Sequence, residues 1–231
     1  MTGSGLQAGA LAGSKRLTLT FDNGPTPGIT ERVLDILSTH GVAATFFVIG
    51  SQLYDRRAAA LLPRITGAGH RIGNHTLNHK VALGDRPDAS FARSEIDATQ
   101  ALIGEYADAE KLFRPYGKDG LLGPHLFSRA ALTHLQQDGY TSLLWNLVPG
   151  DWLNPAGWDG ACLDALVSLA WPVVVLHDIN DSCLARLPSF LDRLADLGYA
   201  IESTFPDSVV VTRGGHFVTL SEDMVSDGMP A

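Results

Sequence analysis

Two histidines spaced four residues apart form the clearest chemical feature of the sequence. This spacing places His75 and His79, in the segment GNHTLNH, on one side of a helical turn or compact loop. Two imidazoles in that arrangement can bind one metal ion, but a catalytic site usually has three protein ligands and an open position for water. A pair of solvated surface histidines gives the same pattern, so the prediction of a metal site depends on which residues the fold brings beside them.

The segment TFDNGPTP is the second candidate. Asp22 and Asn23 are adjacent, and the turn at Gly24-Pro25 would fix the direction of both side chains. Taken alone, this segment is an ordinary Asx-turn. It gains chemical meaning only if the chain places it beside the histidine pair.

Apolar strand-like runs alternate with helical patterns along most of the chain, which is typical of repeated βα units. We predict strands at residues 16–21, 42–49, 70–73, 111–114, 140–147, 172–176 and 199–205. Helices are predicted at residues 30–40, 54–68, 88–106, 128–138 and 184–197, the first, third and fourth capped by Thr30, Asp88 and Ser128. The pattern indicates an α/β fold of about seven parallel strands, either closed as a barrel or open as a doubly wound sheet.

Polar residues follow five of the predicted strands at the point where each strand ends. Asp22 follows the first strand, His75 the third, Arg114 the fourth, Asp151 the fifth and His177 the sixth. The C-terminal ends of parallel strands meet at one rim, and active sites of α/β folds are built there. We therefore predict that these five side chains share one site.

Size and composition are those of a single globular domain. The chain has 231 residues, 45% of them apolar, and no internal repeat or linker. We expect residues 15–231 to form one domain and residues 1–14, rich in Ala, Gly and Ser, to form a flexible N-terminal arm. Cys162 and Cys183 lack the CxxC spacing of a thiolate metal site, so we expect buried free thiols.

The charge and hydropathy patterns exclude several classes of partner. With a formal net charge of -8, the chain has no excess of positive charge that would attract nucleic acid or an anionic membrane. No stretch approaches the ~18 consecutive apolar residues that span a bilayer. The first residues also lack the basic start and the apolar run of roughly 7–15 residues of a secretory signal, so a cytoplasmic location is expected.

Five short motifs carry a resemblance to a known family. FDNGP, HTLNH, FRPYG, GDW and VLHD occur in the order of the five motifs of NodB-type polysaccharide deacetylases, carbohydrate esterase family 4, and the match spans about residues 16–205. The resemblance implies a distorted (β/α) barrel that removes an N-acyl group, usually acetyl, from an amino sugar, oligosaccharide or glycolipid precursor. It also implies a divalent metal cofactor, for which Zn²⁺ is the main candidate and Co²⁺ and Mn²⁺ are alternatives. The implied substrate is a small molecule or an oligosaccharide.

The same resemblance assigns the central roles. Asp22 resembles the general base of the family, and His177 resembles the acid that protonates the leaving amine. Asn23, His75 and His79 occupy the three metal-ligand positions.

Supporting roles follow from the flanking motif positions. Arg114 would orient Asp22, and Asp151 would partner His177. The backbone N–H of Tyr116 would help to stabilise the oxyanion. Trp152 and Leu176 resemble the apolar wall and the acyl-methyl pocket, although plain core packing accounts for both equally well.

The sequence departs from the family pattern at two motifs. Asn23 stands where the family usually has a second aspartate, so the metal site loses one negative charge. The third motif has one proline between Arg114 and Tyr116 where the family usually has two. His125, on the loop after the fourth strand, is a spare histidine that could reach the site.

Two alternative functions stay open from the sequence. A small cyclic amide or imide hydrolase, similar to allantoinases, uses the same fold and the same kind of site. A carbohydrate-binding pseudoenzyme would have lost its metal through the change at Asn23.

Overall fold

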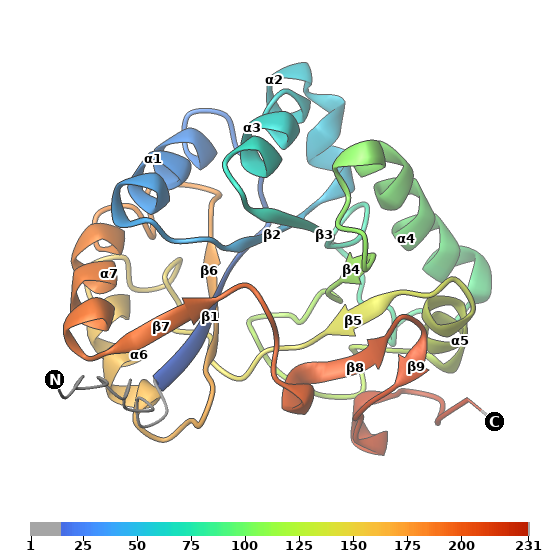
Figure 1. Ribbon diagram of the computed structural model, residues 1–231. Coiled ribbons are helices and arrows are strands. Elements are labelled where there is room, and N and C mark those ends of the chain that lie inside the picture. Colours follow the sequence, from blue (N-terminus) through green and yellow to red (C-terminus); the bar gives the residue numbers. More distant parts are fainter. Residues whose placement is uncertain (1–14, 231) are drawn as a thin grey trace, which may run out of the picture.

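The computed structural model describes residues 15–230 and has a nine-stranded sheet at its centre (Figure 1). The seven predicted strands are all present and pair in parallel: β1 (Lys15–Asp22), β2 (Thr45–Val48), β3 (Arg71–Asn74), β4 (Leu112–Phe113), β5 (Thr141–Leu143), β6 (Val173–His177) and β7 (Tyr199–Glu202). Their order is β6-β1-β2-β3-β4-β5, and β7 pairs with the first half of β1 while β6 pairs with the second half. The predicted α/β class with parallel strands is confirmed.

The two ends of the parallel sheet approach each other after β5. Leu147 forms an isolated parallel bridge with Val174 of β6, and the Val175 N–H donates to the Leu147 carbonyl at 3.0 Å. The Asn146 side chain extends this junction by accepting from the Val173 N–H at 2.7 Å and donating to the Trp171 carbonyl at 3.0 Å. One bridge and one amide side chain therefore stand where a regular barrel would have a full strand pair.

An antiparallel extension of the sheet, which periodicity did not predict, follows β7. The strands β8 (Val210–Arg213) and β9 (His216–Phe217) continue the sheet beyond β5. β8 pairs with β5 across a register shift between Ser142 and Leu143, so the pairing is irregular. These strands pair antiparallel and lie outside the repeated βα units, so the pattern that predicts the other strands does not include them.

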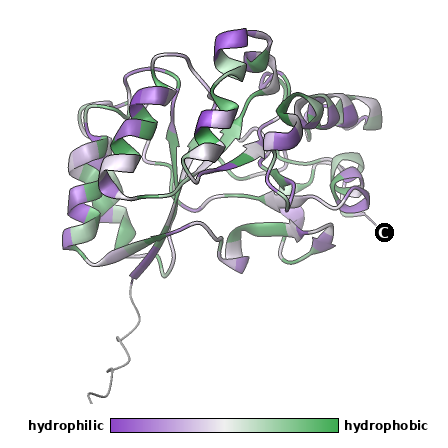
Figure 2. Ribbon diagram, turned by 45° about the horizontal axis from the view of Figure 1, so that its top comes forward, coloured by the Kyte–Doolittle hydropathy of each residue, from purple (hydrophilic) through white to green (hydrophobic). Residues whose placement is uncertain are grey.

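Seven helices of the described residues lie on the outside of the strands (Figure 1). They are α1 (Thr30–His40), α2 (Arg56–Ala59), α3 (Leu62–Gly67), α4 (Ala89–Ile103), α5 (Arg129–Gln137), α6 (Trp158–Leu166) and α7 (Leu187–Asp196). Hydrophilic residues lie on their outward surfaces and hydrophobic residues face the strands (Figure 2). None of the helices between residues 15 and 230 is long and apolar enough to cross a membrane.

The helix ends test the capping predictions. Asp88 accepts from the Phe91 N–H at 2.7 Å and Ser128 from the Ala131 N–H at 3.2 Å, so both caps are confirmed. The prediction for Thr30 is wrong, because Thr30 lies inside α1 and Ile29 occupies the cap position without a side-chain bond.

One predicted helix is divided in the structure, and one helix of the structure was not predicted. The predicted helix at 54–68 is divided into α2 and α3, because Pro63 has no N–H to continue a helix and is tolerated only in a first turn. α6 was not predicted.

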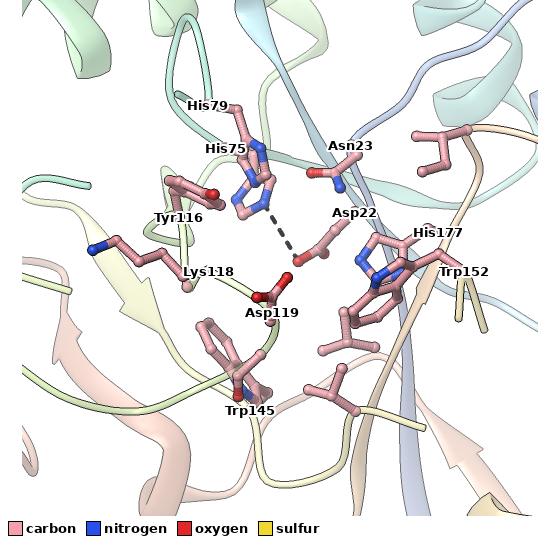
Figure 3. A pocket seen from close by; sticks show the side chains of 15 residues that line it. Asp22, Asn23, His75, His79, Tyr116, Lys118, Asp119, Trp145, Trp152 and His177 are labelled. Carbon is pink, nitrogen blue, oxygen red and sulfur yellow. Dashed lines mark hydrogen bonds and ion pairs between the residues drawn. The ribbon is translucent and has the colours of Figure 1, made fainter. Parts of the chain in front are cut away.

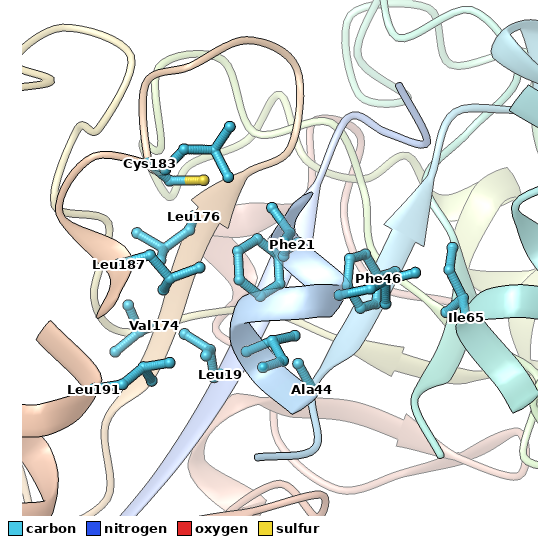
Figure 4. Packing of buried hydrophobic residues seen from close by; sticks show 14 of the residues in the cluster. Leu19, Phe21, Ala44, Phe46, Ile65, Val174, Leu176, Cys183, Leu187 and Leu191 are labelled. Atoms are coloured by element: carbon cyan, nitrogen blue, oxygen red, sulfur yellow. The ribbon is translucent and has the colours of Figure 1, made fainter. Parts of the chain in front are cut away.

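Two hydrophobic clusters pack on opposite faces of the sheet. Successive residues of a strand point to opposite faces, so Phe46 joins one cluster and Phe47 the other. In the first, Phe21 and Phe46 stack with ring centroids 5.1 Å apart, and Leu176 and Leu187 lie beside them (Figure 4). Cys162 and Cys183 are buried free thiols of the same cluster, as predicted.

The predicted domain of residues 15–231 is described up to residue 230. The predicted N-terminal arm, residues 1–14, lies outside the described residues.

The close packing of β3 against β2 predicts the effect of one methyl group. A Cβ at Gly73 would lie 2.5 Å from two ring carbons of the fully buried Phe47 and 3.2 Å from the Leu112 Cβ. We expect Gly73→Ala to lower the free energy of unfolding by about 1–3 kcal/mol, as overpacking does. Gly160→Ala in α6, where a Cβ would meet nothing within 4 Å, should raise it by about 0.5–1 kcal/mol. Urea denaturation measures both, and equal midpoints for the two variants would contradict the prediction.

Candidate active site

A cavity of about 180 Å³ lies at the C-terminal ends of the strands. Seven predicted site residues line it and their labelled side chains point into a common space (Figure 3): Asp22, Asn23, His75, His79, Tyr116, Trp152 and His177. Arg114 and Asp151 lie behind this lining, each in contact with a side chain that reaches the cavity. The cavity is smaller than the ~300 Å³ of ordinary ligand pockets, so only part of an oligosaccharide can lie inside it.

Asp22 is held by a buried arginine. The Arg114 Nη1 donates to Asp22 Oδ1 at 2.8 Å and to Thr20 Oγ1 at 2.8 Å, and its Nη2 donates to the Leu144 carbonyl at 3.3 Å. The guanidinium also stacks over the Phe47 ring, 4.1 Å from its centroid. Because Oδ1 is engaged in this ion pair, Oδ2 is the oxygen of Asp22 that remains for chemistry in the cavity.

His75 presents a free lone pair to the cavity. Its Nδ1 lies 2.8 Å from the Arg114 carbonyl, which can only accept, so Nδ1 carries the proton. Its Nε2 lies 3.6 Å from Asp22 Oδ2. Burial lowers the pKa of His75 to about 3, so the ring is neutral at neutral pH and this approach is not an ion pair. A neutral imidazole whose other nitrogen donates to a carbonyl is the form that binds metal ions.

His79 is the second neutral imidazole. Its ring centroid lies 4.6 Å from that of His75 and 4.0 Å from that of Tyr116. Burial, followed by the proximity of His75, lowers the pKa of His79 to about 3. His79 has a positive φ of 51°, so the backbone enters the left-handed region to direct this ring to the cavity.

The loop that carries both histidines is fixed by its asparagines. Asn74 accepts from the Thr76 N–H at 3.0 Å and donates to the Ile96 carbonyl of α4 at 2.8 Å. Asn78 donates to Glu95, also of α4, through its backbone N–H at 2.9 Å and its side chain at 2.7 Å. The two amides therefore fix the backbone of the loop that carries the imidazoles.

Asn23 provides the oxygen that a metal site needs. Its Oδ1 is buried and has no hydrogen-bond partner among the described residues, which is costly unless a ligand satisfies it. Its backbone has φ 76°, a region that asparagine tolerates better than most residues, and its N–H donates to the Phe47 carbonyl at 3.2 Å. One amide oxygen and two neutral imidazoles form a donor set that suits a divalent transition metal.

His177 is paired with Asp151 on the opposite side of the cavity from the histidine pair (Figure 3). The His177 Nδ1 donates to Asp151 Oδ1 at 2.7 Å, and Asp151 Oδ2 accepts from the His177 N–H at 3.0 Å and from Ser182 Oγ at 3.2 Å. Burial acts to lower the pKa of His177, but the hydrogen bond and charge of Asp151 raise it above the ordinary value. The imidazole therefore favours its protonated form at the cavity.

The apolar wall differs from the expectation at one residue. Trp152 lines the cavity, with its ring edge-on to His177 at 4.6 Å between centroids. Leu176 does not line it: the side chain is fully buried in the core cluster beside Phe21. Because alternate residues of β6 point to opposite faces, Val175 reaches the cavity instead.

Asp178 is a buried acid that sequence reasoning missed. It accepts from Thr30 Oγ1 at 2.6 Å, and Thr30 in turn accepts from the Thr26 N–H at 2.7 Å. The Asp178 carboxylate occupies the space into which a Cβ at Gly24 would project. Burial raises the pKa of Asp178 to about 6. This contact joins the segment after β1 to the end of β6, and the motif VLHD contains the residue that makes it.

The segment after Tyr116 also lines the cavity, which sequence reasoning did not anticipate. Lys118, Asp119 and Gly120 of this segment belong to the lining, and so does Trp145, which follows β5. The signal was available, because the polar residues KDG directly follow the FRPYG motif at the end of the fourth strand.

Two of the histidines outside the cavity could also be considered for a functional site. His125, the spare histidine of the sequence, is not among the lining residues. His134 forms a group with Asp97 and Asp138 that could hold a cation, but its two ring nitrogens lie 2.6 Å and 2.9 Å from those carboxylates. Both nitrogens are thus satisfied by acidic partners on α4 and after α5, which accounts for the group without an ion.

Comparison with known proteins agrees with the motifs. Residues 11–143 match the family described as polysaccharide deacetylase. The chain is 31% identical to a chitooligosaccharide deacetylase of Sinorhizobium fredii, covering 83% of this chain and 91% of that protein. It is 29% identical to a peptidoglycan-N-acetylmuramic acid deacetylase of Bacillus subtilis, covering 82% and 70%.

A solved structure gives the same result. A family 4 acetyl xylan esterase from Clostridium thermocellum, solved in complex with a cobalt ion, superposes with a TM-score of 0.65 at 28% identity, covering 81% of this chain and 87% of that one. The chain therefore belongs to the polysaccharide deacetylase family and is a carbon–nitrogen amide hydrolase of that family.

Proposed function

We propose that this chain removes an N-acyl group, specifically acetyl, from an amino sugar of an oligosaccharide or a glycolipid precursor, with a divalent metal as cofactor. The observation that carries the proposal is the arrangement of Asp22 and His177 around one cavity. Arg114 holds the first and Asp151 the second, so a base and an acid face the same small space. Amide hydrolysis requires both groups, because the leaving amine must be protonated as the C–N bond breaks.

Asn23, His75 and His79 would hold the metal, with Zn²⁺ as the first choice and Co²⁺ or Mn²⁺ as alternatives. The support is the unpartnered Asn23 Oδ1 and the lone pair of His75 Nε2, which both belong to the cavity lining. When bound, a divalent cation acidifies water and polarises the scissile carbonyl.

Asp22 serves as the general base. Its Oδ2 faces the cavity, while Arg114 forms an ion pair with Oδ1 and fixes the direction of the carboxylate. The carboxylate accepts the proton of the attacking water, and it needs no rearrangement of the ion pair to do so.

His177 serves as the general acid from the other side of the cavity. Asp151 favours the imidazolium and fixes the ring through Nδ1, which leaves Nε2 to donate a proton to the leaving nitrogen. The backbone N–H of Tyr116 makes no hydrogen bond with residues 15–230 and would stabilise the oxyanion. Trp152 and Val175 would enclose the acyl methyl group.

Acetate release from N-acetylglucosamine oligomers in the presence of zinc tests the function. We expect turnover by the wild-type chain, and a loss of about 10²-fold or more in kcat for Asp22→Asn, because the base is removed while the shape is kept. Asp207→Asn, an exposed acid paired with Arg213, is the matched control and should keep full activity. If the purified chain is inert and Asp22→Asn is indistinguishable from it, the proposal is wrong; opening of small cyclic amides in a parallel assay would favour the alternative substrate class.

The partnership of His177 and Asp151 predicts the pH dependence of catalysis. Asp151 raises the pKa of His177, and the acid must be protonated to act, so activity is lost as the pH rises through this pKa. Asp151→Asn removes the charge, and we expect the alkaline limb of the kcat profile to move to lower pH. Ser182→Ala, which leaves the carboxylate in place, should leave the limb unmoved. An unchanged limb in Asp151→Asn would mean that His177 is not the acid.

Metal retention tests the role of Asn23. Restoring a carboxylate with Asn23→Asp adds a negative ligand, and we expect zinc affinity to rise by about tenfold or more. His75→Ala should abolish stoichiometric binding. Elemental analysis after dialysis against a graded series of chelators measures both. Equal affinity in the wild type and Asn23→Asp would exclude Asn23 as a ligand, and an absence of binding by the wild type would favour the carbohydrate-binding pseudoenzyme.

A further inference from the structure

We propose that Asp119 is a specificity-determining residue that selects amino-sugar chains carrying neutral or ammonium-bearing units at the cavity mouth, against units that carry a carboxylate. The inference rests on the proposed function, because it names the class of sugar which that site accepts. It is carried by the position, the conformation and the charge of this one side chain.

The segment that carries Asp119 is held firmly at both ends. At its start, Gly117 packs so closely on the Trp145 ring that a Cβ would overlap the ring carbons. At its end, the Trp145 Nε1 donates to the Gly120 carbonyl at 2.9 Å, and the Leu121 N–H donates to the Lys118 carbonyl at 3.0 Å. The segment is therefore a fixed part of the cavity mouth.

The backbone between these anchors is left-handed at three successive residues. Lys118 has φ 35°, Asp119 has φ 38° and Gly120 has φ 79°. For a residue other than glycine this region costs about 1 kcal/mol or more, and such outliers gather at sites where function depends on them. The conformation separates two neighbouring side chains: Asp119 lies between Asp22 and Trp145, whereas Lys118 extends to the side (Figure 3).

Among the charged side chains that line the cavity, Asp119 is the one without an oppositely charged partner in residues 15–230. Asp22 is paired with Arg114, and His177 is paired with Asp151. The adjacent cation, Lys118, is engaged with Asp85 at 2.6 Å. Asp119 forms no ion pair or side-chain hydrogen bond with any residue between 15 and 230, although it is exposed at the mouth and lines the cavity.

An unpaired carboxylate at this position discriminates between amino sugars by charge. Since the cavity of about 180 Å³ admits only part of an oligosaccharide, the neighbouring sugar unit must lie at the mouth. A hydroxyl group or an ammonium group there can donate to Asp119, whereas a carboxylate there is repelled. Chains of N-acetylglucosamine and glucosamine meet this condition. Glycans with N-acetylmuramic acid, whose lactyl ether bears a carboxylate, do not.

Three acetylated substrates test the proposal: an N-acetylglucosamine oligomer, the same oligomer with one glucosamine unit beside the reacting sugar, and a glycan with N-acetylmuramic acid in that place. The measurement is kcat/KM for acetate release from each. We expect Asp119→Asn to reduce the preference of the wild type for the first two substrates over the third by about fivefold or more. Asparagine adopts left-handed backbone readily, so this variant keeps the conformation of the segment.

Salt and a matched variant separate charge recognition from a structural effect. Raising the salt to about 1 M, where the Debye length is ~3 Å, should weaken the preference of the wild type and leave that of Asp119→Asn unchanged. Asp35→Asn makes the same change in net charge on the exposed surface of α1 and should behave as the wild type.

The outcomes distinguish this proposal from the proposed function. Acetate release with a preference that neither Asp119→Asn nor salt alters would overturn the role of Asp119 and leave the deacetylase function standing. A preference that Asp35→Asn changes as much as Asp119→Asn does would also overturn it. A wild-type chain that releases acetate from none of the three substrates would contradict the deacetylase function itself.

Discussion

The buried pair of Arg114 and Asp22 is the interaction on which the site depends. A guanidinium with no exposed surface is tolerated only where its charge is balanced, and here Asp22 supplies the opposite charge while Thr20 and the Leu144 carbonyl accept from the terminal nitrogens. These partners belong to β1 and to the segment directly after β5, while the arginine follows β4. One side chain thus connects the ends of β4 and β5 to β1, although β2 and β3 lie between β1 and β4 in the sheet. The carbonyl of the same residue also fixes His75, so the base and the histidine pair share one support.

The sequence predicts the parallel part of the fold well, because that part obeys local rules. Every βα unit has an apolar strand, and Asp88 and Ser128 mark helix starts by a side-chain bond to the following turn. The features that were missed depend on distant partners. Thr30 looks like a cap in the sequence, but Asp178 and Thr26 engage its hydroxyl. β8 and β9 pair antiparallel and lie outside the repeated βα units from which the other strands were predicted.

The candidate site likewise contains residues that could be predicted from local rules and residues that could not. The residues at strand ends could be predicted because topology alone brings them to one rim. Leu176 could not be placed, because the choice between Leu176 and Val175 depends on the register of β6, and a shift of one residue exchanges core for cavity. Asp119 faces the cavity through a left-handed backbone that no helical or strand pattern encodes. The amides of Asn74 and Asn78 take their partners from α4, and no local pattern of the sequence predicts where that helix lies relative to the loop.

The contact between Gly24 and Asp178 couples two segments that lie more than half the chain apart in sequence. Because the carboxylate fills the place of a side chain at position 24, a larger residue there requires a smaller one at position 178. The turn that presents Asn23 and the strand end that presents His177 therefore form one mechanical unit. A designer who grafts this site onto another α/β fold must therefore transfer both halves together.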